Sequence, residues 1–138
     1  MALTAVLAWL SALTFYDLRW RRLPNWLTLP GAAVVLIAAA LAGRGGPAAM
    51  GAAALFALYA ATHLLAPAAL GAGDAKLALG VGGLTGAFGP DVWLLAALSA
   101  PLLTSACALL LPARRERTVP HGPSMCVASA AAIALVLF

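Results

Sequence analysis

Six apolar runs occupy most of this 138-residue chain, and short breaks rich in glycine, proline or charge separate them. Hydrophobic residues make up 64% of the sequence and charged residues only 9%, whereas a soluble domain carries about 25% charged residues. We therefore predict an all-α fold, a single integral-membrane domain over residues 1–138. It is a polytopic membrane helix bundle with about six transmembrane helices, at 2–16 (continuing through 18), 26–42, 48–66, 74–88, 91–111 and 122–138.

The positive charges lie at the ends of these runs and predict an orientation, because cytoplasmic loops carry an excess of Lys and Arg. With the N-terminus outside, the inward-facing breaks hold seven of the eight Lys and Arg residues, namely Arg19, Arg21, Arg22, Lys76, Arg114, Arg115 and Arg117. Only Arg44 falls outside. We predict a multi-pass protein of the cell (cytoplasmic/inner) membrane with both termini outside. The net charge of +4 then reflects topology in the lipid bilayer, and no nucleic-acid partner is expected.

Two of the four carboxylates fall on the same, cytoplasmic side of this layout. Asp17 ends the first run and Asp74 begins the fourth, whereas Asp91 lies on the opposite side and Glu116 in a basic loop. An acid at the edge of a lipid-embedded helix is energetically costly and is a functional candidate by default. We expect Asp17 and Asp74 to meet at the inner rim of the bundle.

A pair of carboxylates at a water-accessible boundary is typical of aspartic proteolysis. One carboxylate takes a proton from water while the other, still protonated, polarises the scissile carbonyl, and mutual repulsion supplies this division. Helix dipoles favour the anion at the start of a helix and the neutral acid at its end, which makes Asp74 the base and Asp17 the acid. This assignment rests on the dipoles alone, and the pair titrates as a unit.

The residues around the two acids complete the candidate site. Gly71 and Gly73 precede Asp74 and would allow unusual backbone conformations and the close approach of a substrate strand. Lys76 is interpreted mainly as an interfacial anchor whose charge lies near Asp74. After Asp17, Pro24 interrupts the helix and Asn25 is a candidate N-cap for the next one.

The histidines and cysteines do not form a recognisable metal site. His63 is interpreted as a polar packing or interface residue near the end of an apolar run, and His121, in a loop, as solvated. Cys107 and Cys126 belong to no Cys-x-x-Cys pair, so no zinc site is expected.

The acid segments resemble those of a known enzyme family. Residues 71–77, Gly-Ala-Gly-Asp-Ala-Lys-Leu, resemble the Gly-x-Gly-Asp signature of membrane aspartic proteases, in particular the type IV prepilin peptidases. Asp17 followed by Leu23-Pro24-Asn25 is similar to their other acid segment, and Gly122-Pro123 to the step that opens their last helix. The resemblance extends from residue 17 to about residue 125.

This resemblance implies cleavage of the basic leader of a type IV prepilin or pseudopilin at the cytoplasmic face, just before its hydrophobic stem. Asp17 and Asp74 would be the catalytic pair, without metal, nucleotide or other cofactor, in type IV pilus assembly or protein secretion. Larger members carry an inserted methyltransferase domain with paired cysteine motifs, which this sequence lacks. The chain resembles the compact, cleavage-only form, and the resemblance leaves its oligomeric state open.

Two other classes remain compatible with the sequence. A small proton-coupled transporter or assembly factor could use the same acids as a relay, although transport sites usually lie near the midplane rather than at one boundary. A membrane aspartic protease of the presenilin or signal-peptide-peptidase kind would need a Pro-Ala-Leu segment after Gly-x-Gly-Asp. Here Pro67-Ala68-Ala69-Leu70 precedes it.

The charge asymmetry predicts the result of a topology experiment. A reporter fused at residue 44 is expected to read as external, and one fused in the 114–117 loop as cytoplasmic, because the second loop holds three arginines. Paired alkaline phosphatase and green fluorescent protein fusions measure this, and the reverse pattern would contradict the layout.

Overall fold

The computed structural model describes residues 2–111 and 119–138, and within them the chain forms six α-helices. The basic loop predicted around residues 114–117 lies outside the described residues. The helices are α1 (Ala2–Trp20), α2 (Asn25–Leu41), α3 (Gly45–Leu65), α4 (Ala72–Phe88), α5 (Pro90–Leu110) and α6 (Gly122–Leu137). The all-helical fold predicted from the sequence is confirmed, and the helix bounds lie within about four residues of those expected.

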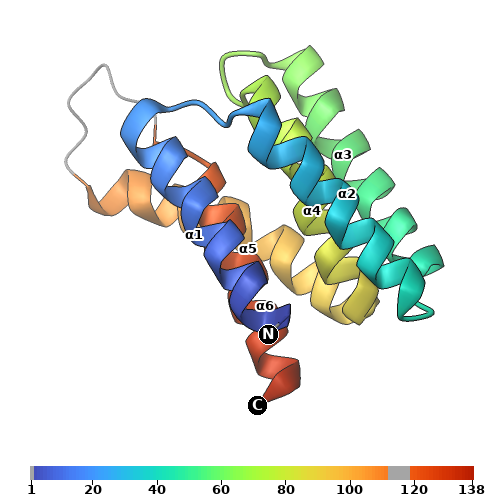
Figure 1. The fold of residues 1–138 in the computed structure, drawn as a ribbon. Helices are drawn as coiled ribbons and strands as arrows, with labels where there is room; N and C mark the ends of the chain where they lie inside the picture. The colour runs from blue at the N-terminus through green and yellow to red at the C-terminus, as the bar shows by residue number, and fades with distance from the viewer. Residues whose placement is uncertain (1, 112–118) are drawn as a thin grey trace.

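Successive helices run in opposite directions, so the connecting loops alternate between the two ends of the bundle (Figure 1). The loops at 21–24 and 66–71 share one end, while both termini and the turn at 42–44 lie at the other. The C-terminal end of α1 and the N-terminal end of α4 therefore meet at the same end. These are the helix ends that carry the two predicted acids.

The helices pack as two groups, α1–α5–α6 and α2–α3–α4, as Figure 1 shows. The two groups join mainly where α4 contacts α5 and α6, whereas α1 meets α2 over only a short length. Helix α4 is the most enclosed element, with ten of its 17 residues buried. The acid at the start of α4 is thus carried on the central helix of the bundle.

Glycines bring α3 and α4 into close contact. A Cβ atom at Gly82 would lie 2.6 Å from the backbone oxygen of Gly51, and one at Gly86 would lie 3.0 Å from the Cα of Gly51. The Gly51 carbonyl also accepts a hydrogen bond of 3.0 Å from the indole of Trp93 on α5. In lipid, where apolar burial drives helix association little, such close backbone packing supplies the attraction.

A tryptophan joins α1 to the other group. The Trp9 indole donates a hydrogen bond of 2.9 Å to the Leu27 carbonyl on α2. The same ring fills the space left by Gly31 and Gly80, since a Cβ atom at either position would collide with it. Trp9 therefore bridges α1, α2 and α4 halfway along the bundle.

The start of α2 differs from the sequence-based expectation. Asn25 was predicted to be the N-cap, but Pro24 occupies that position, with extended backbone (φ −69°, ψ 136°), and Asn25 is the first helical residue. No side chain caps this helix. The fixed φ angle of Pro24 keeps it outside the helix, so the helix begins at the next residue. The side chain of Asn25 therefore does not cap the helix and can bond another partner.

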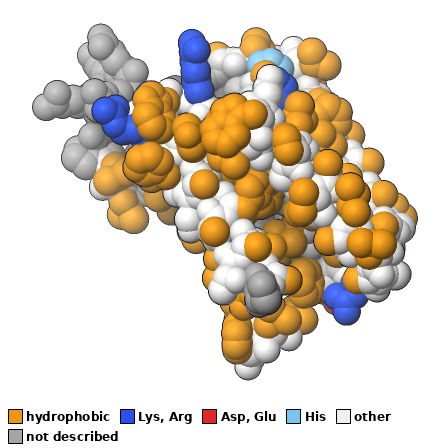
Figure 2. All heavy atoms as spheres, in the orientation of Figure 1, with side chains coloured by type: hydrophobic (Ala, Val, Ile, Leu, Met, Phe, Trp, Pro, Cys, Tyr) orange, Lys and Arg blue, Asp and Glu red, His pale blue; other side chains and the backbone are white. Residues whose placement is uncertain are grey.

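The surface of the bundle is strongly apolar. Large side chains such as Leu41, Leu65 and Leu109 are more than four-fifths exposed, and Figure 2 shows hydrophobic side chains across the middle of the visible face, with Lys and Arg mostly at one end. Among the described residues, two helices, α3 and α5, are both long and apolar enough to cross a membrane, while α2 and α6 are apolar but shorter. These features indicate a membrane protein, and the six crossings remain a prediction.

The glycine contact predicts a position-specific effect on stability. Gly82→Ala is expected to lower the free energy of unfolding by about 1–3 kcal/mol, because its methyl group must push apart the α3 and α4 backbones. Gly46→Ala, on α3 with open space around its Cβ position, is the matched control and should be neutral or slightly stabilising. Thermal unfolding in detergent measures both, and equal melting temperatures would contradict the packing described here.

Candidate active site

Asp17 continues the buried stripe of α1 to the end of the bundle. It follows Leu10 and Leu13 at helical spacing, and only 7% of its surface is exposed. The backbone N–H of Gly122, the first residue of α6, donates a hydrogen bond of 3.1 Å to Asp17 Oδ2. A Cβ atom at Gly122 would collide with that oxygen, so only glycine lets the positive end of α6 come this close to the carboxylate.

Asp74 lies in the first turn of α4 and is half-buried. Gly71 is the N-cap residue, and its backbone amide is placed to hydrogen-bond the Asp74 carboxylate. Leu77, one turn further on, is completely buried, so Asp74 extends the core-facing stripe of its helix in the same way as Asp17 does. Each carboxylate therefore has a backbone amide of its own, and backbone hydrogen bonding alone does not distinguish acid from base.

The two glycines before Asp74 do not have the backbone role expected of them. Gly71 has φ −75° and ψ 153°, a conformation open to other residues, and positive φ occurs at other glycines of the described chain, Gly43 and Gly89. Gly73 instead permits close packing, because a Cβ atom there would lie 3.3 Å from the Leu23 side chain. The expectation of an unusual backbone at Gly71 and Gly73 is therefore wrong, and what Gly73 provides is space for the α1–α2 loop.

The structure brings Asp17 and Asp74 into the same site, 57 positions apart in the numbering. Asp74 lies within reach of the Asp17 charge, and both acids lie near the buried thiol of Cys126 in the first turns of α6. Asp91 begins α5, beyond the far end of α4, and takes no part. Two carboxylates whose charges interact titrate as a pair, so one of them can hold a proton while the other is ionised.

Lys76 and Asn25 form a contact beside the acids. The Lys76 ammonium donates a hydrogen bond of 2.9 Å to Asn25 Oδ1, which ties the second turn of α4 to the first residue of α2. Beside this contact, the Pro24 carbonyl accepts a hydrogen bond of 3.2 Å from the Thr28 hydroxyl. The two sequence segments that carry the family resemblance are thus physically joined. Sequence reasoning gave Lys76 and Asn25 separate roles and missed this link.

His63 closes the loop that leads to Asp74. Its Nδ1 lies 2.6 Å from the carbonyl oxygen of Leu70, at the end of the 66–71 loop. Because Gly71 and Asp74 follow directly, this bond fixes the path of the chain into α4. This hydrogen bond agrees with the polar packing role predicted for His63.

His121 is part of a polar chain that the sequence did not reveal. Its Nε2 lies 2.7 Å from the Tyr59 hydroxyl on α3, and its Nδ1 lies 2.6 Å from the Thr104 hydroxyl on α5. Burial lowers the pKa of His121, so the ring is neutral at pH 7. The expectation that His121 is solvated is wrong. No sequence signal pointed to this link, because the burial of Tyr59 at the end of the α3 stripe, which makes its hydroxyl need a partner, is known only from the structure.

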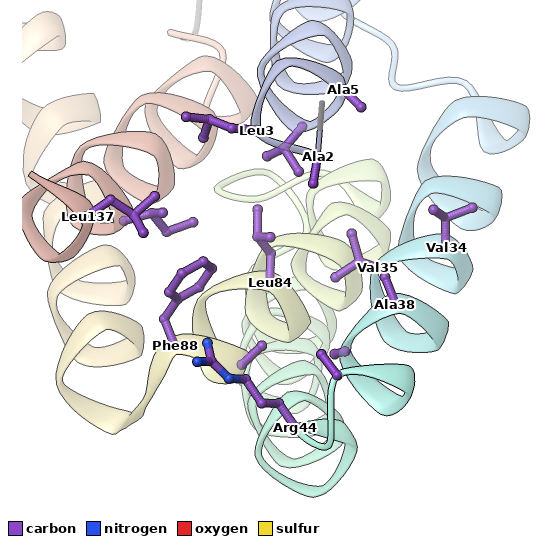
Figure 3. A pocket seen from close by; sticks show the side chains of 15 residues that line it. Ala2, Leu3, Ala5, Val34, Val35, Ala38, Arg44, Leu84, Phe88 and Leu137 are labelled. Atoms are coloured by element: carbon purple, nitrogen blue, oxygen red, sulfur yellow. The ribbon is translucent and has the colours of Figure 1, made fainter.

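The molecule also has an apolar cavity of about 480 Å³ at the end opposite to the acids (Figure 3). Leu84, Val35 and Leu137 contribute to its walls, and the Arg44 guanidinium lies at its edge, 5.7 Å from the centre of the Phe88 ring. No carboxylate lines this cavity. Within residues 2–111 and 119–138, no three His, Cys, Asp or Glu side chains are grouped as metal ligands would be.

The model of the type IV leader peptidase family matches residues 4–138. The chain belongs to the type IV leader peptidase family. No curated protein and no solved structure matches it significantly. Membership identifies the chain as a peptidase and confirms the resemblance inferred from the two acid segments and the Gly122-Pro123 step.

The contact of Gly122 with Asp17 predicts a sensitive position. Gly122→Ala is expected to lower the peptidase rate about 100-fold, because the added methyl group displaces the carboxylate and removes its amide partner. The rate of leader cleavage by protein purified in detergent measures this, with Gly46→Ala as the control. A Gly122→Ala variant that is folded and cleaves within twofold of the wild-type rate would contradict this prediction.

Proposed function

We propose that this chain is a membrane aspartic endopeptidase that cleaves the leader of a type IV prepilin or pseudopilin, with Asp17 and Asp74 activating the attacking water. One observation carries the proposal, namely that two carboxylates from distant parts of the chain share a site at one end of a helix bundle. Family membership supports the peptide-bond chemistry.

In the proposed reaction one carboxylate is ionised and the other protonated when substrate binds. The ionised group removes a proton from water, and the resulting hydroxide attacks the scissile carbonyl carbon while the protonated group hydrogen-bonds the carbonyl oxygen. Collapse of the tetrahedral intermediate breaks the C–N bond, and the proton first taken from water passes to the leaving amine. The half-buried position of Asp74 supports access of water, while the burial of Asp17 supports retention of a proton on the pair.

The proposed location is the cytoplasmic face of the inner membrane. The end of the bundle that carries both acids also carries Arg19, Arg21 and Lys76, which the positive-inside rule assigns to the cytoplasm. Tyr16, Trp20 and Trp26 form a cluster of rings at the same end, with centroid separations of 5.0 and 5.6 Å. Such rings prefer the depth of the lipid headgroups, which supports six crossings with both termini outside.

The proposed substrate has a basic leader followed by a hydrophobic stem, as the family resemblance implies. In this proposal the acids lie at the boundary where such a leader would emerge from the bilayer. The proposal includes cleavage without methylation and without a cofactor, since the sequence contains two cysteines and no inserted domain.

Replacement of either acid tests the proposal. Asp17→Asn and Asp74→Asn keep the size of the side chain but cannot exchange the proton, so each is expected to reduce leader cleavage at least about 100-fold. Asp91→Asn, at the start of α5, is the matched control and should cleave at the wild-type rate. Co-expression with a candidate prepilin and immunoblotting of the mature form measure this.

Wild-type cleavage rates in either Asn variant would exclude the pair as the catalytic centre. Proton-coupled transport without any cleavage by the wild-type protein would instead support the relay function.

A further inference from the structure

The two helix groups each contribute one acid, and a hydrogen-bonded chain crosses between them beside the site. Asp17 belongs to the α1–α5–α6 group and Asp74 to the α2–α3–α4 group. His121, which immediately precedes α6, contacts Tyr59 on α3 and Thr104 on α5. The next residue, Gly122, donates its amide hydrogen to Asp17. The same short segment therefore touches both groups and one of the acids.

The hydrogen bonds fix where each proton lies. The Thr104 hydroxyl has one hydrogen, and the Ala100 carbonyl, which can only accept, takes it at 3.1 Å. The hydroxyl oxygen must then accept from His121 Nδ1, so Nδ1 carries the ring proton. Nε2 is bare and accepts the hydrogen of the Tyr59 hydroxyl. The chain of donors runs in one direction, from Tyr59 to His121 to Thr104 to Ala100.

Burial and ring packing hold the hydrogen-bonded residues in place. Tyr59 is 6% exposed, and its hydroxyl lies within the field of the Asp74 charge. The Tyr59 and His121 rings also pack against each other, with centroids 5.5 Å apart. A histidine fixed at both ring nitrogens cannot rotate without breaking a bond. The backbone that follows it is therefore held in place.

We propose that Tyr59, His121 and Thr104 are positioning residues that lock the two helix groups together and hold the Gly122 amide against Asp17. They act through the acids and do not touch the substrate. The inference rests on the proposed function for its effect on catalysis, but the lock itself is a property of the fold. It is tested by one measurement of structure and one of rate.

The structural measurement is hydrogen–deuterium exchange at the Gly122 amide, together with ¹⁵N spectra of the histidine rings in detergent. The wild-type spectrum should show His121 as the Nδ1–H tautomer, assigned by the signal that is lost in His121→Phe. Tyr59→Phe should shift the Nε2 resonance, and Thr104→Val should populate the other tautomer. His121→Phe, which keeps the ring volume, should speed exchange at Gly122 about tenfold.

Thr62→Val is the matched control for Thr104→Val. Thr62 also lies on a helix and donates to the carbonyl four residues earlier, Leu58, at 2.8 Å, but it is exposed and its hydroxyl does not bond His121. It should leave the ring spectrum and the exchange rate unchanged. An unchanged His121 ring spectrum in Tyr59→Phe, together with unchanged exchange at the Gly122 amide in His121→Phe, would overturn the lock, whether or not the protein cleaves prepilins.

The rate measurement separates positioning from binding. Tyr59→Phe and His121→Phe should each lower kcat about 10- to 100-fold with KM within twofold, because the acids shift while the substrate surface is intact. The double variant should be no slower than the slower single variant, since both remove the same link. His121→Gln, which keeps a donor and an acceptor, should recover part of the loss.

Values of kcat within twofold of wild type, or losses that multiply in the double variant, would overturn the positioning role. If the wild-type protein cleaves no leader while the spectra show the lock, the proposed function fails and the structural inference stands.

Discussion

The hydrogen bond from the Gly122 amide to Asp17 is the interaction on which the site depends. A carboxylate placed among helices and lipid is strongly unfavourable unless a donor stabilises it. Asp17 finds that donor at the start of α6, 105 positions away, at 3.1 Å. The arrangement requires a glycine at 122, a helix that begins there, and an α6 that packs along α1. The first acid is therefore positioned by the fold as a whole rather than by its own helix.

The second acid has a different kind of support. Asp74 begins α4, which is enclosed by both helix groups and held tightly to α3 through Gly51 and Gly82. Local contacts complete its setting, from the His63 bond that closes the preceding loop to the Lys76 bond with the α2 segment. Asp74 thus sits on the central helix of the bundle, in the α2–α3–α4 group, and Asp17 sits in the α1–α5–α6 group. The Tyr59–His121 bond joins these two parts at the level of the acids.

Much of this could be read from the sequence, and the failures have physical causes. Apolar runs and charge asymmetry were sufficient for the helix order and for placing Asp17 and Asp74 at one end. The link of His121 with Tyr59 was not visible, because a loop histidine gains a partner 62 positions away only after the two helix groups have come together. Asn25 is not the N-cap because Pro24 occupies that position, and the side-chain oxygen of Asn25 accepts a hydrogen bond from Lys76 instead. Local rules described the helices, while these polar contacts depended on tertiary packing.

The packing of Trp9 limits which residues can occupy the positions around it. Its ring occupies the volume that side chains at Gly31 and Gly80 would otherwise need, and its indole nitrogen is committed to the Leu27 carbonyl. Positions 9, 31 and 80 consequently share one fixed volume, although they lie on three helices and far apart in the chain. A larger residue at either glycine position requires a smaller residue at position 9. Substitutions at these three positions are therefore coupled.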